Sequence, residues 1–309
     1  MKDHLHLQHP RSEYNIAQPS SRFQQAAFTA EFPPLRKSPP DSKSSPLGTK
    51  ITTALLLAAG TGTRLQPLTS AAPKCLTEIN GVSILERLIG NLRSQGFKRL
   101  IVVIGHLGDQ IQQALQRYAG DMQIDYIINP VYRTTNNLYS LWLAREQISE
   151  PFLLVESDLV FDTSLLDHMI YPDRMAVSKM LPWMNGTTVE LSSSQEVTAF
   201  RMGNASSHQA PQYKTVNIYS LSLLSWEKIE ACLSRYVSDE KLGDYYEIAF
   251  AELIADRTLS FEAVFFEADL WYEIDTAEDL LAAEILFASS HSISHRSTSD
   301  AASAALLPG

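Results

Sequence analysis

Residues Leu55 to Leu76 read LLLAAGTGTRLQPLTSAAPKCL, and this stretch decides the fold. The apolar run 54–59 covers its start, and a short apolar run bounded by glycine is typical of a buried strand in a parallel sheet. Gly60 and Gly62 follow at once, and glycine lets the backbone turn sharply and lets an anion approach bare N–H groups. The stretch therefore predicts a strand that ends in a turn able to hold phosphate.

Two cations follow the glycine turn. Arg64 stands two residues after Gly62, and Lys74 stands ten residues after Arg64, directly behind Pro73. A polyphosphate carries charge on several oxygens at once, and cations at separate points can neutralise it. Other common phosphate-binding patterns are not met, because Leu65 replaces the third glycine of Gly-x-Gly-x-x-Gly and no Gly-Lys-Ser/Thr is present. The turn and its two cations therefore predict a polyphosphate receptor.

The string from Leu57 to Lys74, L-A-A-G-x-G-x-R-L-x-P-L-T-x-x-x-P-K, is more specific than its glycines alone. It resembles the opening motif of the nucleotidyltransferases that join a nucleoside triphosphate to a phosphorylated small molecule, and every position matches. That superfamily includes sugar-phosphate nucleotidyltransferases and the bacterial phosphocholine cytidylyltransferases. The resemblance implies that Arg64 and Lys74 are catalytic and that Mg²⁺ is the cofactor. The loop residues that it implies for nucleotide binding are Leu57, Ala58, Ala59, Gly60, Thr61, Gly62 and Thr63.

Strand and helix patterns alternate between the glycine turn and Asp158. The predicted strands are 100–104, 124–128 and 152–155, and the predicted helices are 83–92, 109–118 and 138–148. Such alternation is typical of right-handed βαβ units around a parallel sheet, whose ligands bind at the carboxyl ends of the strands. The glycine turn, Gly105 and Asp158 each follow a predicted strand. We therefore expect them to share one crevice.

The second half of the chain is richer in strand patterns. The expected strands are 175–180, 187–192, 197–201, 213–222 and 260–266, and the expected helices are 224–236, 245–254 and 276–287. Thr276 can cap the last helix, with Asp279 bonding back to it. The predicted fold is α/β, with a Rossmann-like, mostly parallel mixed sheet flanked by helices. The second half would extend this sheet and supply a β-rich lid over the second substrate.

Composition bounds the rest of the chain. Residues 1–49 hold seven of the fifteen prolines and show no sustained period, so we expect a disordered leader there. We expect residues 50–288 to form the nucleotidyltransferase domain and residues 289–309 to form a flexible tail. The net charge of −10 argues against nucleic acid as a partner. No apolar run approaches the roughly 20 residues of a membrane span, and two cysteines make no disulfide framework, so we expect a cytoplasmic location.

Asp158 and Asp275 are the candidate Mg²⁺ ligands. Asp158 emerges at the end of a predicted strand, and Mg²⁺ usually binds one or two carboxylates together with substrate phosphates. The same spacing fits a turn or helix-cap aspartate equally well. The run WYEID at 271–275 resembles the ending of the phosphocholine cytidylyltransferase group, in which this aspartate completes the metal site. Ser157 is a mild departure, because that group carries glycine there.

A third run, 129–141, reads NPVYRTTNNLYSL and resembles the phosphocholine and 2-aminoethylphosphonate cytidylyltransferases. Adjacent amides and hydroxyls suit reading a base or orienting a polar head group, although one of the asparagines is also expected to cap a helix. The further residues expected to bind the nucleotide are Gly105, Asn136, Asn137 and Ser140. Aromatic rings and carboxylates can hold an ammonium head, and a lysine can hold a phosphate. The residues expected to bind the second substrate are Tyr132, Trp183, Lys214, Trp271 and Glu273.

The favoured reaction is transfer of CMP from CTP to a small phosphorylated or phosphonylated amine, with release of pyrophosphate. The alternatives are a sugar-1-phosphate nucleotidyltransferase that uses UTP, GTP or dTTP, and a glycosyltransferase of similar sheet architecture. A glycosyltransferase would normally show an Asp-x-Asp metal pair, and this chain has Glu156-Ser157-Asp158. A catalytically silent subunit of the same descent is disfavoured by the intact Arg64 and Lys74. The expected partners are therefore a nucleoside triphosphate and a small phosphorylated acceptor.

Deletion of residues 1–48 should leave the melting temperature and the activity nearly unchanged, because this segment offers little periodic apolar surface to a core. Thermal melts and a pyrophosphate-release assay on the full and shortened chains check this expectation. A fall of several degrees in Tm would show that the segment packs against the rest of the protein.

Overall fold

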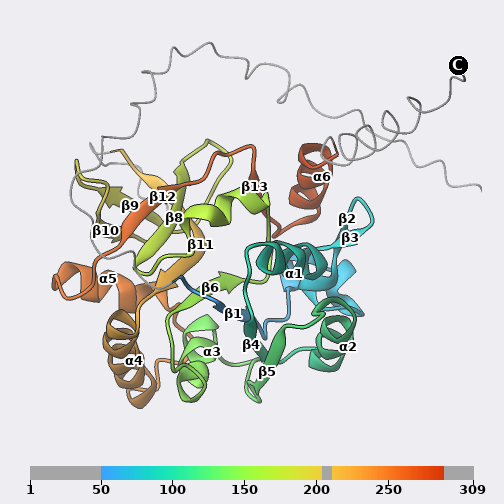
Figure 1. The fold of residues 1–309 in the computed structure, drawn as a ribbon, viewed down its shortest axis with the longest axis horizontal. Helices are drawn as coiled ribbons and strands as arrows, with labels where there is room; N and C mark the ends of the chain where they lie inside the picture. Colours follow the sequence, from blue (N-terminus) through green and yellow to red (C-terminus); the bar gives the residue numbers. More distant parts are fainter. Residues whose placement is uncertain (1–49, 204–210, 289–309) are drawn as a thin grey trace, which may run out of the picture. The chain divides into compact units, whose positions relative to one another are not determined.

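The apolar run before the glycine turn forms β1 (Thr53–Ala58), and every residue of this strand is buried. It lies between two parallel neighbours, β4 (Arg99–Ile104) and β6 (Phe152–Glu156), and β5 (Gln123–Ile128) pairs in parallel with β4. A strand in the middle of a parallel sheet is covered on both faces, which explains its unbroken apolar sequence. The predicted parallel core of the sheet is confirmed (Figure 1).

The computed structural model describes residues 50–203 and 211–288, so the leader and the tail predicted at 1–49 and 289–309 lie outside the described residues. The other strands are β2 (Glu78–Ile79), β3 (Val82–Ser83), β7 (Leu159–Phe161), β8 (Arg174–Lys179), β9 (Thr188–Leu191), β10 (Val197–Arg201), β11 (Tyr213–Leu221), β12 (Glu262–Phe265) and β13 (Trp271–Glu273). The α-helices are α1 (Ile84–Ser94), α2 (Gly108–Tyr118), α3 (Asn137–Leu143), α4 (Leu223–Ser238), α5 (Glu247–Ala255) and α6 (Ala277–Leu286). Short 3₁₀ helices are η2 (Thr63–Leu65), η3 (Leu68–Ser70), η4 (Lys74–Leu76), η5 (Ala144–Glu146) and η6 (Thr163–His168).

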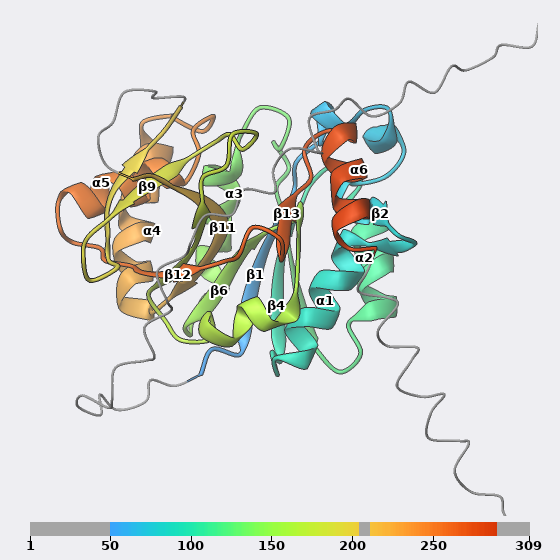
Figure 2. The same ribbon diagram turned by 90° about the horizontal axis from the view of Figure 1, so that it is seen from above.

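Successive residues of β1 serve two separate hydrophobic cores, one on each face of the sheet. Leu56 joins a core that includes the apolar faces of α1 and α2. Leu55 and Leu57 join a second core with α3, α4 and α5. This division follows from the two-residue period of a strand. Figure 2 shows the sheet between these two groups of helices, so the prediction of a sheet flanked by helices is confirmed.

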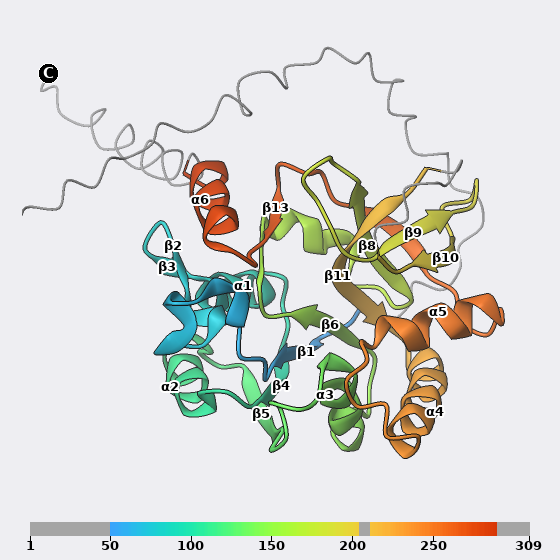
Figure 3. The same cartoon turned by 180° about the vertical axis from the view of Figure 1, so that it is seen from behind.

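The second half of the chain continues the same sheet. Strand β11 pairs antiparallel with β6, with β8 and with β9, and β10 and β12 extend the sheet beyond them. The register of β11 shifts between Thr215 and Tyr219, where Asn217 has a φ of 60°. Before this bulge β11 pairs with β9, and after it β11 pairs with β6 (Figure 3). The predicted extension of the sheet is confirmed, whereas its role as a lid stays a prediction.

Two predicted helices have different ends in the structure. The helix predicted at 138–148 stops at Leu143 and continues as the 3₁₀ turn η5, where Arg145 stacks on the ring of Trp142 and donates to its carbonyl. This bond satisfies one of the carbonyl groups that every helix end leaves open. The helix predicted from 245 begins at Glu247. Within the described ranges, no helix has the length and apolarity needed to cross a bilayer.

Gly105 couples the end of β4 to the glycine turn, and a substitution there tests this contact. A Cβ atom at Gly105 would lie 2.7 Å from the carbonyl oxygen of Ala59 and 2.8 Å from Cβ of Tyr132. Gly105→Ala should therefore destabilise the protein by about 1–3 kcal/mol through overpacking. Gly90, in α1, has open space around it, and Gly90→Ala should stabilise by up to about 1 kcal/mol through helix propensity. Urea unfolding of both variants checks the pair, and equal stability of Gly105→Ala and wild type would contradict the packing argument.

Candidate active site

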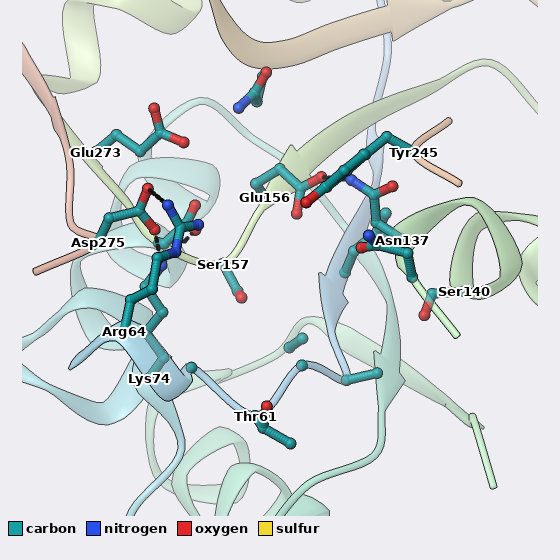
Figure 4. Close-up of a pocket in the computed structure, with 18 of the residues that line it drawn as sticks. Thr61, Arg64, Lys74, Asn137, Ser140, Glu156, Ser157, Tyr245, Glu273 and Asp275 are labelled. Atoms are coloured by element: carbon teal, nitrogen blue, oxygen red, sulfur yellow. Dashed lines mark hydrogen bonds and ion pairs between the residues drawn. The ribbon is translucent and has the colours of Figure 1, made fainter. Parts of the chain in front are cut away.

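A cavity of about 700 Å³ lies at the carboxyl ends of β1 and β6. Most of the predicted site residues border it, although they come from segments far apart in the sequence (Figure 4). Those that do are Leu57, Ala58, Ala59, Gly60, Thr61, Gly62, Thr63, Arg64, Lys74, Tyr132, Asn136, Asn137, Ser140, Asp158, Lys214, Glu273 and Asp275. The parallel sheet therefore places the cavity where such sheets generally bind ligands.

Three predicted site residues do not border the cavity. Gly105 lies behind the glycine turn, against Ala59 and Tyr132. Trp183 is 59% exposed. Trp271 is 3% exposed and lies in the hydrophobic core that includes the apolar faces of α1 and α2. Burial of a large aromatic ring in a core contributes much hydrophobic free energy. The sequence pattern does not distinguish a tryptophan in the core from one that contacts a ligand. We therefore leave these three residues out of the proposed substrate contacts.

The backbone of the glycine turn packs closely against Lys74. Gly62 has a φ of 62°, and a Cβ there would lie 3.1 Å from Cβ of Lys74 and from Cγ2 of Thr69. Its carbonyl oxygen accepts hydrogen bonds from the Thr69 hydroxyl, at 2.8 Å, and from the Leu65 N–H, at 3.0 Å. Glycine is thus required both by the left-handed backbone and by the close approach of Lys74.

Lys74 lies between the two predicted metal ligands. Its Nζ is 2.8 Å from Oδ2 of Asp158 and 2.7 Å from Oδ1 of Asp275. Nη1 of Arg64 lies 2.8 Å from Oδ2 of Asp275. Burial lowers the pKa of Lys74, but the charges and hydrogen bonds of the two aspartates outweigh it and raise the pKa above its ordinary value. The lysine therefore remains an ammonium at neutral pH, as charge neutralisation requires.

Backbone pairing brings the two aspartates together. Strand β13 runs antiparallel to β7, and the Ile274 N–H donates to the Asp158 carbonyl at 2.9 Å. Asp279 then accepts from the N–H groups of Asp275 and Thr276, at 3.0 and 2.8 Å. Thr276 and Asp279 form the predicted capping box at the start of α6, which is thereby confirmed. The short β7–β13 sheet and this cap together fix Asp275 beside Asp158.

The aspartate pair has the donors that a hard divalent cation needs. Oδ1 of Asp158 is buried and has no hydrogen-bond partner in the part of the chain that the structure describes. Within the same residues, no group of three or more His, Cys, Asp or Glu side chains forms a closed metal site. Mg²⁺ suits such a partial set, because it usually takes one or two carboxylates and completes its shell with water and phosphates. The residues fit the predicted Mg²⁺ site, whose occupancy stays a prediction.

The two adjacent asparagines organise the opposite wall of the cavity. Asn136 caps α3, and its Oδ1 accepts from the Asn137 N–H at 2.9 Å, which confirms the expected cap. Asn137 donates from Nδ2 to Oε1 of Glu156 at 3.1 Å and accepts the Tyr246 N–H at 3.0 Å. Asn137 thus ties strand β6 to the start of α5. Both amides already have protein partners, so the run at 129–141 positions the wall as well as lining it.

Glu156 and Glu247 also border the cavity, and the sequence reasoning did not select them. Burial raises the pKa of Glu247 to about 7 and raises that of Glu156 well above its ordinary value. Lys214 is buried and lies 3.1 Å from Glu273, so this pair is internally neutral. The local signals were present, because Glu156 ends an apolar strand and Glu247 follows two tyrosines. Only the packing shows that both residues border the cavity.

Comparison with known proteins supports the class of this fold and site. A family model described as the MobA-like NTP transferase domain matches residues 54–176. The CMP-5'-(3-aminopropyl)phosphonate synthase of Streptomyces rubellomurinus is 32% identical over 245 residues, which is 76% of this chain and 38% of the relative. The choline-phosphate cytidylyltransferase of Streptococcus pneumoniae is 32% identical over 108 residues, which is 35% of this chain and 45% of the relative. The chain therefore spans less than half the length of these curated relatives.

A solved structure agrees with the fold over most of the described domain. The CTP:phosphocholine cytidylyltransferase from Streptococcus pneumoniae superposes with a TM-score of 0.65 at 22% identity, covering 77% of this chain and 99% of that one. Residues 54–176 thus match an NTP transferase domain, and the described residues share the mixed, mostly parallel sheet of that solved structure. Its relatives include this phosphonate synthase and cytidylyltransferases of choline phosphate and 2-aminoethylphosphonate, which confirms the resemblance found in the sequence motifs.

The raised pKa of Glu247 predicts a pH-dependent stability. A carboxyl whose pKa is about 7 in the folded protein and 4.5 in the unfolded chain stabilises the fold at low pH, and this contribution is lost as the pH rises through 7. Lys214 and Glu273 act on this carboxyl, and both side chains remain in Glu247→Gln. Between pH 5 and 8 the wild type should lose about 2.5 kcal/mol more unfolding free energy than Glu247→Gln.

Urea unfolding without ligand at several pH values measures this difference. Glu252→Gln is the matched control, because Glu252 lies on the same helix, pairs with Arg235 and is outside the cavity. It should keep the wild-type dependence on pH over this range. Parallel pH curves for wild type and Glu247→Gln would show that Glu247 is ionised in both states.

Proposed function

We propose that this chain is a Mg²⁺-dependent cytidylyltransferase that transfers CMP from CTP to a small phosphorylated or phosphonylated amine and releases pyrophosphate. One observation carries the proposal: the Lys74 ammonium lies within 2.8 Å of both Asp158 and Asp275, beside a glycine turn that opens into the cavity. The two cytidylyltransferase relatives support the choice of nucleotide and acceptor class. The family match favours this class over a glycosyltransferase of similar sheet.

The reaction is an in-line substitution at phosphorus. A phosphate or phosphonate oxygen of the acceptor forms a bond to the α-phosphorus of CTP, and the bond from that phosphorus to the bridging oxygen breaks. The electron pair of the broken bond leaves with pyrophosphate, so the protein forms no covalent intermediate. Catalysis in such a reaction comes from positioning and charge neutralisation.

Each proposed role follows from where the side chain lies. The N–H groups of Ala59 to Thr63 and the exposed guanidinium of Arg64 hold the triphosphate, because all of them border the cavity. Lys74, held as an ammonium, neutralises the charge shared by the α-phosphate and the incoming oxygen. Bound Mg²⁺, held by Asp158 and Asp275, would neutralise phosphate oxygens.

The remaining assignments concern the residues that would bind the nucleotide base and the acceptor. Asn136, Asn137 and Ser140 border the cavity and offer neutral hydrogen-bonding groups, as recognition of a base requires. We propose that they face the cytosine end of CTP, with Tyr132 and Lys214 toward the acceptor.

The acidic net charge of −10 supports small-molecule partners over nucleic acid, and we propose a cytoplasmic location.

Lys74→Ala tests the reaction class. Loss of one preorganised charge at the reacting phosphorus should lower kcat by roughly 10²-fold or more while circular dichroism stays native. Lys98→Ala is the control, because Lys98 is exposed and lies outside the cavity, and it should keep wild-type turnover. Pyrophosphate release is measured with CTP, UTP, GTP and dTTP, each with 2-aminoethylphosphonate, phosphocholine or glucose-1-phosphate. Wild-type turnover by Lys74→Ala overturns the role of Lys74, and fastest turnover of glucose-1-phosphate overturns the acceptor class.

A further inference from the structure

Away from Lys74, the cavity is bordered by more acidic groups than cations. Glu156, Glu247 and Glu273 all border it, and we call these three residues the acid cluster. Lys214 pairs with Glu273 at 3.1 Å and also donates to the Thr215 carbonyl at 2.8 Å. Glu156 has the neutral amide of Asn137 as a partner. The acid cluster therefore lacks cations for two of its three carboxylates among the described residues.

Glu247 is the least satisfied member of the acid cluster. The residue is 6% exposed, and its Oε2 is buried with no hydrogen-bond partner in residues 50–203 and 211–288. The hydroxyls of Tyr219 and Tyr246 are likewise buried without partners there, and their rings lie 5.8 Å apart. A buried polar atom without a partner costs free energy, and a buried carboxylate without one costs more. Such a group on a cavity wall is complementary to a ligand that donates hydrogen bonds and brings positive charge.

The backbone holds Glu156 and Glu247 in one assembly. Asn137 donates to Glu156 and accepts the N–H of Tyr246, and Glu247 follows as the first residue of α5. Both carboxyl groups border the cavity, and Asn137 links them through these two hydrogen bonds. A single cation with N–H groups could meet both and would supply the partner that Oε2 of Glu247 lacks among the described residues.

We propose that Glu247, together with Glu156, receives the ammonium group of the acceptor through N–H hydrogen bonds, so that the site selects a primary ammonium over a trimethylammonium. This inference rests on the proposed function and narrows its acceptor to amines that carry N–H groups. It also moves the ammonium away from Trp271 and Glu273, where the sequence placed it, because Trp271 is in the core and Glu273 is neutralised by Lys214.

The aromatic residues around the cavity support the same choice. A trimethylammonium has no N–H donor and depends on ring faces, which commonly form a cage around it. Among the residues that line the cavity, the aromatic ones are Tyr132 and Tyr245. The Arg133 guanidinium lies 5.6 Å from the centroid of the Tyr132 ring, and Tyr245 is 58% exposed. The lining thus contains the Glu247 carboxyl group, whose buried Oε2 has no partner among the described residues, and no set of enclosing rings.

Two pairs of substrates that differ only in N-methylation test the inference. The pairs are phosphoethanolamine with phosphocholine, and 2-aminoethylphosphonate with its trimethylammonium analogue, each assayed with CTP for pyrophosphate release. We expect kcat/KM to favour the primary amine of each pair by at least tenfold. We expect this difference to arise mostly from KM and little from kcat, because the ammonium group of the acceptor is remote from its reacting oxygen.

Glu247→Gln should lower kcat/KM for the primary amines at least tenfold and change that for phosphocholine much less, so that the preference within each pair shrinks. Glu247→Asp, which keeps the charge, should retain part of the preference, and Glu252→Gln on the same helix should retain all of it. Native circular dichroism and unchanged CTP binding by calorimetry exclude misfolding as the cause.

The outcomes separate this inference from the proposed function. Turnover of all four amines with no preference, or an unchanged preference in Glu247→Gln, overturns the inference alone. Faster turnover of the trimethylated member of each pair also overturns it. Absence of pyrophosphate release with all four amines, or release only with glucose-1-phosphate, overturns the proposed acceptor class and this inference with it.

Discussion

Two aspartates share one partly buried lysine, and the rest of the site depends on that arrangement. The Lys74 side chain is largely withdrawn from water, so its charge is stable only because Asp158 and Asp275 lie within 2.8 Å of it. The three residues belong to η4, to the turn after β6 and to the segment after β13. Any change that separates these segments leaves buried charge unpaired, which links the stability of the domain to the geometry of its site.

The sheet provides the space that this cluster borders. Strand β1 ends at the glycine turn, and the neighbouring β6 ends at Glu156. On the far side of β6, the bulge at Asn217 shifts β11 from its pairing with β6 to its pairing with β9. Asn217 borders the cavity at the point where the strands diverge. Strand ends and a β-bulge thus open a hollow in an otherwise continuous sheet, as bulges commonly do beside functional sites.

The cavity contains two kinds of charge in different places. Arg64 and Lys74 lie at the glycine turn and can meet phosphate oxygens, whereas Glu156 and Glu247 lie where the asparagine wall meets α5. A small zwitterion with an anionic phosphorus group and an ammonium head matches both parts at once. A sugar phosphate has hydroxyl donors for the Glu247 oxygen, but it brings no positive charge to offset the acidic groups on this side of the cavity.

The sequence by itself determined the parts that depend on local chemistry. The apolar run, the two glycines and the motif that follows identified β1, the turn, Arg64 and Lys74, because strand formation, backbone turns and motif spacing are all properties of neighbouring residues. The cap formed by Thr276 and Asp279 was predicted for the same reason. Most strands and helices also lie within a few residues of their predicted positions, since alternating apolar patterns report local structure.

The tertiary structure alone decided which polar and aromatic side chains face the cavity. Trp271 packs into a core and Trp183 stays exposed, although both were expected to contact the second substrate. Lys214 meets Glu273 across distant segments, and this pairing changed the role expected of both residues. Only the tertiary structure shows that Oε2 of Glu247 is buried without a hydrogen-bond partner among the described residues. Burial and pairing depend on residues far away in the chain, so no local pattern could have reported them.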